Sequence, residues 1–322
     1  MFIDGKGSTR ILVVRLGAMG DILHALPAVA SLKHSYRNAR LTWVVKPQWA
    51  PLLEGNPFVD RILLLRRDFP GGLYRSWRDL RSEPYDFAVD FQGLLQSATL
   101  ASAAHPDRVF GFHQSQLRER AAGIFYSVKT LSTSAHVVDR NLDLAAAAGA
   151  ASLLHTFPLP PGSPEGQLPE GDFVLASPLA GWRSKQWPLE HYAALATRLR
   201  SQLGVPLVLN APPGASYPQV PAALLHCSGL RGLIHATRRA AAVVGVDSGP
   251  LHMAAALAKP GVALFGPTDP ARNGPYGGTL RVLRSPGAVT TYKRGSVIDE
   301  SMRQIDPDTV FEALKTALGC LV

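Results

Sequence analysis

The stretch Val243–Pro270, VVGVDSGPLHMAAALAKPGVALFGPTDP, decides the fold. Residues 241–246 form a short apolar run rich in β-branched side chains, which predicts a strand buried on both faces of a sheet. Helical signals follow over 251–259, because Pro250 suits the first turn of a helix and Pro260-Gly261 ends it. A second buried strand is predicted over 262–265. A strand, a helix and another strand in this order indicate an open, parallel α/β sheet.

Polar residues follow both of these strands. Asp247-Ser248-Gly249 comes after the first, and Gly266-Pro267-Thr268-Asp269-Pro270 after the second. In open parallel sheets ligands bind beyond the carboxyl ends of the strands, near helix N-termini whose N–H groups favour phosphate. The stretch therefore predicts a binding site for a phosphate-bearing ligand.

The rest of the chain repeats this alternation in two halves. With 322 residues, 46% of them apolar and 18% charged, the chain is long enough for two globular domains. Five prolines with interspersed glycines over 151–171 indicate a linker, so we expect doubly wound, Rossmann-like domains over 1–160 and 161–322. Val109–Phe110 is expected to be the last strand of the first domain, and a helix is expected around Ala222.

The last predicted helix spans Pro307–Leu318. Asp306 is its expected N-cap, since aspartate favours that position and proline fits the first turn. The sequence leaves open whether this helix packs on the second domain or returns to the first.

Charge and cysteine content restrict the function. The net charge of +9 and isoelectric point near 9.8 favour an anionic partner. The positive charge is spread over both halves without basic blocks, so nucleic acid is not expected. Two cysteines are too few for a disulfide framework or a zinc ribbon. The N-terminal segment is charged on both sides of a four-residue apolar run, residues 11–14, which predicts neither a signal peptide nor a membrane span.

The loop after the first predicted strand superficially resembles a dinucleotide-binding turn. Gly17 and Gly20 do not make the G-x-G-x-x-G pattern, however, and no acidic residue follows the next strand, 41–45. This argues against a Rossmann-type, NAD(P)-dependent oxidoreductase.

Several motifs together resemble one family. They are ILVVRLGAMGDILHALPAV at 11–29, DFQGLLQSA at 90–98, GWRSKQWP at 181–188, VDSGPLHMAAAL at 246–257 and FGPTDP at 265–270. Over nearly the whole chain and in the same order, they resemble the bacterial lipopolysaccharide heptosyltransferases of glycosyltransferase family 9, most closely the heptosyltransferase I type.

This resemblance implies a GT-B fold, with two Rossmann-like domains facing across a cleft, the first for the acceptor and the second for the nucleotide sugar. It implies transfer of L-glycero-D-manno-heptose from ADP-heptose to a Kdo sugar on lipid A, with inversion and without an essential metal or other cofactor. We accordingly expect a cytoplasmic, monomeric enzyme in peripheral contact with the inner membrane.

Asp21 is the expected catalytic base. Inverting transfer needs a group that takes the proton of the acceptor hydroxyl, and Asp21 matches the family's catalytic aspartate. The alternative is that Asp21 only caps the helix predicted from Ile22, because aspartate is a favoured N-cap. His24, one turn further on, is counted with the acceptor-binding residues and either orients the Asp21 carboxyl group or packs in the core.

The resemblance assigns the donor site to the second domain. Lys185 matches the family's phosphate-binding lysine, and a lysine and helix N-termini are suitable partners for a departing diphosphate. Each of these assignments has a plainer alternative. Lys185 could be an ordinary solvated lysine, His252 a buried structural histidine, and the 266–270 segment an ordinary turn. Trp187 is expected in the core. Asp247 is expected to bind heptose hydroxyls or to cap a helix. The other expected donor-binding residues are Gly181, Ser184, Ser248, Gly249, His252, Thr268 and Asp269.

For an acidic acceptor the first domain should supply cations, since arginine forms bidentate pairs with carboxylate and phosphate. The expected acceptor-binding arginines are Arg61, Arg66, Arg67, Arg118 and Arg120.

One departure from the family concerns the nucleotide. The segment Asn210–Ser216 lacks the acidic residue that contacts the ribose in the family, and Asn210 or Ser216 could replace it.

Two alternatives remain beside this interpretation. One is a family-9 enzyme with another sugar donor or a later core acceptor, which a donor panel would distinguish. The other is a non-catalytic sugar-nucleotide binding protein, in which Asp21→Asn would leave binding intact with no turnover to lose.

Overall fold

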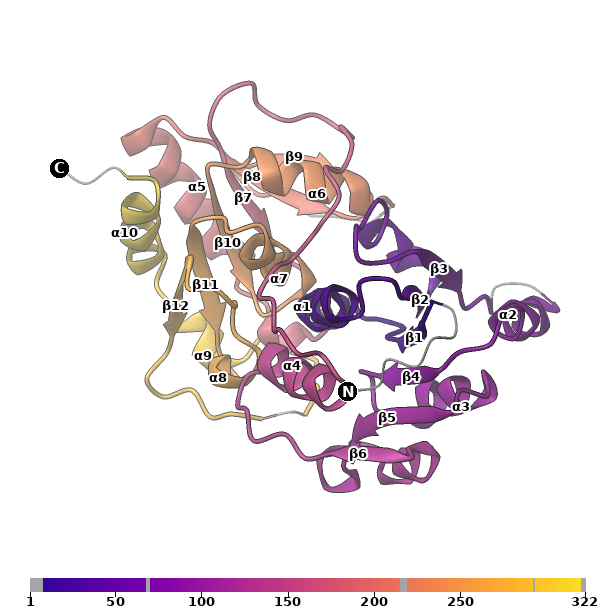
Figure 1. Cartoon of the computed structure of the whole chain (residues 1–322). Coiled ribbons are helices and arrows are strands. Elements are labelled where there is room, and N and C mark those ends of the chain that lie inside the picture. Colours follow the sequence, from indigo (N-terminus) through magenta and orange to yellow (C-terminus); the bar gives the residue numbers. More distant parts are fainter. Residues whose placement is uncertain (1–7, 68–69, 215–218, 292, 320–322) are drawn as a thin grey trace. The chain divides into compact units, whose positions relative to one another are not determined.

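The computed structural model describes residues 8–67, 70–214, 219–291 and 293–319. The chain divides into two compact units, Met1–Pro160 and Pro161–Val322. The division falls inside the proline-rich 151–171 segment. In each unit, parallel strands alternate with helices (Figure 1).

The first unit is built on a six-stranded parallel sheet in the order β3-β2-β1-β4-β5-β6. The order reverses at β1, which pairs with both β2 and β4, and such a switch point is where open α/β sheets bind ligands. The strands are β1 (Arg10–Val14), β2 (Arg40–Val45), β3 (Arg61–Leu64), β4 (Phe87–Asp90), β5 (Arg108–Phe112) and β6 (Val128–Thr130). The α-helices are α1 (Met19–Ser35), α2 (Gly72–Leu80), α3 (Leu95–Ala103) and α4 (Val137–Ala147), and the 3-10 helices are η1 (Pro47–Leu52), η2 (Gln114–Gln116) and η3 (Arg120–Phe125).

The second unit repeats this topology, with the strand order β12-β11-β10-β7-β8-β9. Its switch point lies between β7 and β10, which pair in parallel. The strands are β7 (Val174–Ser177), β8 (Leu207–Ala211), β9 (Leu224–Cys227), β10 (Ala242–Val246), β11 (Gly261–Phe265) and β12 (Leu280–Arg284). The helices are η4 (Arg183–Lys185), α5 (Leu189–Leu203), α6 (Leu230–Arg239), α7 (Gly249–Ala256), α8 (Pro270–Asn273), α9 (Glu300–Arg303) and α10 (Pro307–Ala317).

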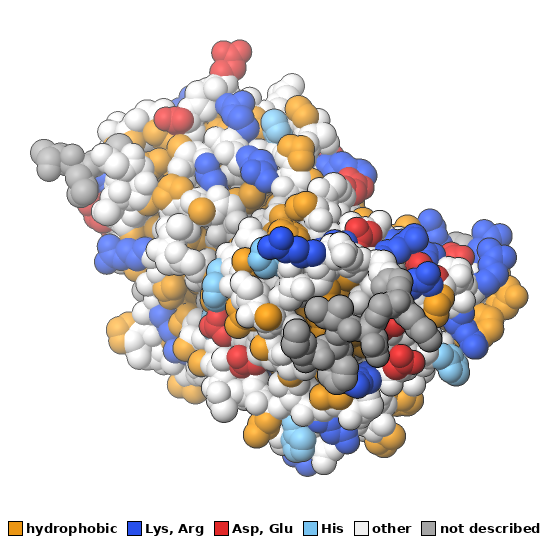
Figure 2. Space-filling model, viewed as in Figure 1, with side chains coloured by type: hydrophobic (Ala, Val, Ile, Leu, Met, Phe, Trp, Pro, Cys, Tyr) orange, Lys and Arg blue, Asp and Glu red, His pale blue; other side chains and the backbone are white. Residues whose placement is uncertain are grey.

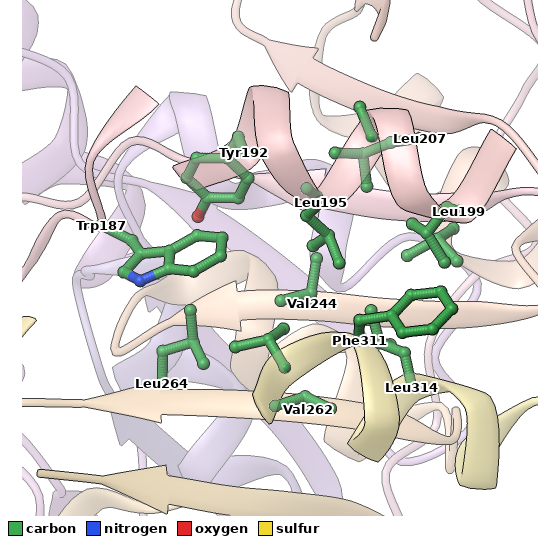
Figure 3. Close-up of a cluster of buried hydrophobic side chains, with 14 of the residues drawn as sticks. Trp187, Tyr192, Leu195, Leu199, Leu207, Val244, Val262, Leu264, Phe311 and Leu314 are labelled. Atoms are coloured by element: carbon green, nitrogen blue, oxygen red, sulfur yellow. The ribbon is translucent and has the colours of Figure 1, made fainter. Parts of the chain in front are cut away.

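The core of the second unit forms where α5 and α10 pack against the sheet (Figure 3). Apolar side chains of α5 recur three and four residues apart, as an amphipathic helix requires. Trp187 is fully buried and its Nε1 donates a hydrogen bond to the Ile305 carbonyl at 2.9 Å, so its predicted place in the core is confirmed. Helix α10 contacts α5, β10 and β11, so it packs on the second unit. The carboxylate of Asp306 accepts the N–H groups of Asp308 and Thr309, which confirms the predicted cap.

Gly261 allows β11 to approach β10 closely. Its φ is +152°, and a Cβ added there would lie 1.9 Å from the Val243 carbonyl oxygen. Only glycine fits such a backbone contact.

Two sequence-based expectations are wrong, and both concern strands at sheet edges. The helix expected around Ala222 is absent, and the exposed edge strand β9 follows instead. Val109 and Phe110 lie in β5, which is followed by one more strand, β6. Edge strands bury only part of their side chains, so they lack the continuous apolar run that marks a central strand.

The described residues include no helix whose length and apolarity would let it cross a bilayer.

Candidate functional site

Asp21 lies in the first turn of α1, directly after the loop that leaves β1. The helix begins at Met19, earlier than predicted, so Asp21 is its third residue. Its Oδ2 accepts the N–H of Ala18, the N-cap residue, at 3.0 Å. Asp21 is therefore not the N-cap that the alternative expected, although its side chain satisfies one N–H at the start of the helix. The other oxygen, Oδ1, pairs with Arg15 at 2.8 Å, and the Asp21 side chain is 46% exposed. A carboxylate has about four lone-pair sites, so these contacts leave it able to accept a proton from a bound hydroxyl.

Arg15 connects Asp21 to the loop that follows the neighbouring strand β4. Its buried guanidinium donates to the Phe91 carbonyl as well as to Asp21. In the same place the N–H of Leu16 donates to Gln92 Oε1 at 2.8 Å. The loops after β1 and β4 are therefore held together by side chains that are themselves buried or half-buried.

Asp90, the last residue of β4, fixes the shape of that second loop. It is fully buried and accepts hydrogen bonds from the Gln92 N–H, the Ser97 hydroxyl and the Tyr126 hydroxyl at 2.7–2.8 Å. Burial away from water raises the pKa of Asp90, although these bonds oppose the rise. Burial and the nearby Asp90 carboxylate also raise the pKa of Tyr126.

The sequence analysis assigned no role to Arg15, Asp90 or Gln92. The available signal was DFQGLLQSA, a polar motif directly after a predicted buried strand next to the first one.

Gly17 shapes the loop before Asp21. Its φ is +144°, and an added Cβ would lie 2.5 Å from Nε1 of Trp49. The indole on η1 therefore covers this loop closely, and a side chain at position 17 would displace one or the other.

His24 packs in the core. It is buried, and its ring lies edge-on to that of His136, with the centroids 5.9 Å apart. The packing alternative is therefore the one that the structure supports.

The five candidate arginines differ in their surroundings. Arg61 is the first residue of β3, so it lies at the amino end of the strand, opposite the edge that carries Asp21. It pairs with Glu83 and donates to Ser82 Oγ at 3.2 Å. Its guanidinium is thus engaged at the edge away from Asp21, so the structure lends no support to its predicted acceptor-binding role, which stays a prediction. The other four follow the carboxyl ends of β3 and β5 and are exposed: Arg66, Arg67, Arg118 and Arg120.

In the second unit, Lys185 and Asp247 form the centre of the predicted donor site. Lys185 Nζ lies 2.6 Å from Asp247 Oδ2 and 4.3 Å from the centroid of the Trp182 ring. Nε2 of His252 lies 3.5 Å from the other Asp247 oxygen. The N-cap of α7 is Ser248, the residue after Asp247, so Asp247 is not that cap. Its carboxylate pairs with the lysine and the histidine instead. Lys185 is equally not the solvated lysine of the alternative.

Asp247 is held as an anion. Burial alone would raise the pKa of Asp247, but the hydrogen bond and charge of His252 and the ammonium of Lys185 lower it well below its ordinary value. The side chain is only 6% exposed. Buried charges require partners of this kind.

Three hydroxyl groups lie at the same carboxyl edge of the sheet as Lys185 and Asp247. Ser184 Oγ, Ser248 Oγ and Thr268 Oγ1 are shielded from solvent, and none has a hydrogen-bond partner within the ranges that the structure describes. They follow β7, β10 and β11, three neighbouring strands of the sheet. Buried polar groups are normally satisfied, so three such hydroxyls at the carboxyl edge indicate a place for a ligand with acceptor oxygens.

The remaining predicted donor residues lie at the same edge. Gly181 is exposed and Gly249 is the first residue of α7. Asp269 caps α8 by accepting the Ala271 N–H at 2.9 Å. Asn210 is buried in β8 and accepts from Ser228 Oγ at 3.0 Å, and Ser216 lies outside the described residues.

Neither a surface hollow nor a metal cluster adds to the site. A hollow lined by Leu168, Pro206 and Leu225 lies at the amino ends of β8 and β9, away from the carboxyl edge. Within the described ranges no three His, Cys, Asp or Glu side chains are grouped to hold a metal ion.

Comparisons with known proteins agree with this geometry. The model of glycosyltransferase family 9 (heptosyltransferase) matches residues 73–298. Lipopolysaccharide heptosyltransferase 1 of Escherichia coli strain K12 is 28% identical over 86% of this chain and 94% of its own length. Lipopolysaccharide heptosyltransferase 2 of Salmonella typhimurium is 29% identical over 96% of this chain and 99% of its own. The structure of E. coli heptosyltransferase WaaC with ADP-2-deoxy-2-fluoro heptose matches with a TM-score of 0.76 at 25% identity, covering 96% of this chain and 99% of that one. The fold is accordingly of the GT-B class.

Proposed function

Because the chain belongs to glycosyltransferase family 9 (heptosyltransferase), we propose that it transfers L-glycero-D-manno-heptose from ADP-heptose to a Kdo sugar on lipid A, with inversion at the anomeric carbon. The observation that carries the proposal is that Lys185, Asp247 and three hydroxyls with no partner among the described residues share the carboxyl edge of the second sheet. Together they offer a cation and hydrogen-bond donors to a diphosphate.

Asp21 acts as the base in this proposal. As the acceptor oxygen attacks C1 of the heptose, its proton passes to the Asp21 carboxylate, the bond between C1 and the phosphate oxygen breaks, and ADP departs with the bonding electrons. Arg15 holds the Asp21 carboxylate in place through the ion pair between them.

Lys185 stabilises the departing ADP. An ammonium has three N–H donors, and Asp247 accepts one of them, so two remain for phosphate oxygens. Ser184, Ser248 and Thr268 donate hydroxyl hydrogens to the same ligand. Asp247 fixes the position of Lys185 and, by repulsion, keeps phosphate off its own side of the site.

No metal or other cofactor takes part in this proposal. We also propose that the enzyme works as a monomer in the cytoplasm, at the inner membrane where a lipid-linked acceptor is found. Turnover that is unchanged by a chelator, and a monomer mass in solution, are the expected results.

Transfer to a later core sugar is the second candidate. It is favoured by the similarity to heptosyltransferase 2, which extends over 96% of this chain. The lack of a carboxylate in the 210–216 segment does not help to choose between the two candidates, because that segment concerns the nucleotide and not the acceptor.

The test is transfer by the purified enzyme from ADP-, GDP- and UDP-linked heptose to Kdo–lipid A and to the same acceptor already carrying one heptose. The proposal predicts product with ADP-heptose and the unheptosylated acceptor. Product only with the heptosylated acceptor would support the second candidate, and product only with GDP- or UDP-heptose would contradict the choice of donor.

A further inference from the structure

We propose that helix α2 (Gly72–Leu80) is a docking surface for an anionic phospholipid bilayer. The proposal goes beyond the transfer reaction, because α2 contributes no residue to the chemistry described above. It draws on the proposed function in one respect only, the choice of a membrane as partner, which suits a lipid-linked acceptor.

Helix α2 is held to the first unit by a single row of residues. Gly72, Ser76 and Leu80, four residues apart, are its buried positions. The Ser76 hydroxyl accepts the N–H of Arg66 at 2.9 Å and lies 3.1 Å from the carbonyl oxygen of Leu64, at the end of β3. The rest of the helix surface faces outward.

The outward rows carry large apolar side chains. Leu73, Tyr74 and Trp77 are 53%, 63% and 43% exposed. The rings of Tyr74 and Trp77 lie 6.0 Å apart between centroids, so they form one patch. Tryptophan and tyrosine are the aromatic residues that favour membrane interfaces, where one end of the ring is apolar and the other is wet.

Arginines surround this patch. Arg81 continues the row of Leu73 and Trp77, with its guanidinium 5.2 Å from the centre of the Trp77 ring, and Arg78 continues the row of Tyr74. The segment 70–81 contains three arginines and one acidic residue, Asp79. Figure 2 shows hydrophobic and basic side chains side by side where Figure 1 places α2. Basic residues beside apolar ones on a surface helix are typical of attachment to anionic lipid.

The size of the patch favours a membrane over a protein partner. Three side chains that are about half exposed offer roughly 300 Å² of contact, whereas a stable protein interface takes about 800 Å² from each partner. A bilayer needs no matching surface, since a few side chains inserted at the headgroup level act together with charge attraction. The position also suits the substrate, because α2 follows the carboxyl end of β3 at the edge of the sheet that carries Asp21.

The test is co-sedimentation of the full chain with phosphatidylglycerol-rich vesicles and with pure phosphatidylcholine vesicles. We expect binding to the anionic vesicles that weakens with salt. The triple variant Leu73→Ser/Tyr74→Ser/Trp77→Ser and the double variant Arg78→Glu/Arg81→Glu should each bind about tenfold more weakly or worse.

Matched controls remove the same kinds of side chain elsewhere. Val289→Ser/Val297→Ser deletes two exposed apolar side chains, and Arg37→Glu/Arg281→Glu reverses two exposed charges. Both controls should bind like the wild type. All variants should keep the wild-type transfer rate on an acceptor stripped of its acyl chains, which shows that they are folded.

A second measurement locates the contact. Brominated lipid should quench the tryptophan fluorescence of the wild type, and Trp77→Phe should lose that quenching. The proposal is overturned if the wild type does not bind anionic vesicles, or if the α2 variants bind them as well as the wild type does. It is also overturned if immobilised polyglutamate retains the wild type while vesicles do not, because the partner would then be an acidic polypeptide and not a membrane. The vesicle assays contain no donor sugar, so their failure leaves the transferase proposal standing. The absence of transfer by the wild type in the acyl-free assay would count against the transferase proposal alone.

Discussion

Asp21 in the first unit and Asp247 in the second each follow a strand beside the switch point of a six-stranded sheet, close to the start of a helix. Asp21 is half exposed and pairs with one arginine. Asp247 is buried between a lysine and a histidine. Asp21 follows β1, the first strand of its unit, and Asp247 follows β10, the fourth strand of its own, so the two lie on opposite sides of equivalent switch points. The exposed carboxylate can exchange a proton with a substrate, whereas the buried, paired one fixes the groups around it.

Replacing the exposed carboxylate should have the largest effect on rate. We expect Asp21→Asn to lower kcat by about 10²–10⁴-fold, the usual contribution of a general base, with ADP affinity close to that of the wild type. Steady-state kinetics and calorimetry measure the two quantities. Asp107→Asn, an exposed aspartate of the same unit, serves as the control. A loss of ADP affinity equal to the loss of rate would contradict the assignment.

Replacing the buried carboxylate should have the largest effect on stability. Asp247→Asn leaves Lys185 without its buried partner, so we expect the free energy of unfolding to fall by about 3 kcal/mol. Asp21→Asn should cost less, because the Asp21 side chain is half exposed and the buried Arg15 keeps its hydrogen bond to the Phe91 carbonyl. Urea denaturation compares the two.

The stability difference between the wild type and Asp247→Asn should shrink only at low pH. The folded-state pKa of Asp247 is depressed below 3.8, so its contribution is complete above that value and is lost as the pH falls through the lower, folded-state pKa. A wild-type advantage over Asp247→Asn that vanished between pH 6 and 8 would contradict the ion pair as its source.

Removing the lysine should separate donor binding from acceptor binding. We expect Lys185→Ala to weaken ADP binding about ten- to a hundredfold, because hydrogen bonds to charged groups contribute about 1.5–3 kcal/mol, and to leave acceptor binding nearly unchanged. Calorimetry with each ligand measures this, with Lys315→Ala as the control. Unchanged ADP affinity would remove Lys185 from the donor site.

The sequence predicted the central strands of both sheets because those strands are buried on both faces and read as continuous apolar runs. It did not predict β6, β9 or β12, which lie at sheet edges and expose several of their side chains. An edge strand forms because it pairs with a neighbouring strand, and that pairing is a tertiary contact. In β9, Leu224 and Leu225 are adjacent and both exposed, so the sequence shows no alternation of apolar and polar residues that would indicate a strand.

The candidate site was predictable where a motif carried it. The strand-to-helix turns placed Asp21, Lys185, Asp247 and Ser248 at the carboxyl edges of their sheets, where the structure has them. The links between loops were not predictable, because Arg15 meets Phe91 across 76 positions of sequence. Arg61 was predicted from its residue type alone, without regard to its place at the amino end of β3.

The account depends most on Asp21 accepting a proton and not serving only as a helix cap. The direct measurement is the single-turnover rate of Asp21→Ala with both substrates saturating, as formate is added. We predict a slow rate that rises with formate concentration, because a small carboxylate can take the place of the missing base. A slow rate that formate leaves unchanged would mean that Asp21 only shapes the start of α1, and a rate equal to that of the wild type would remove it from the mechanism.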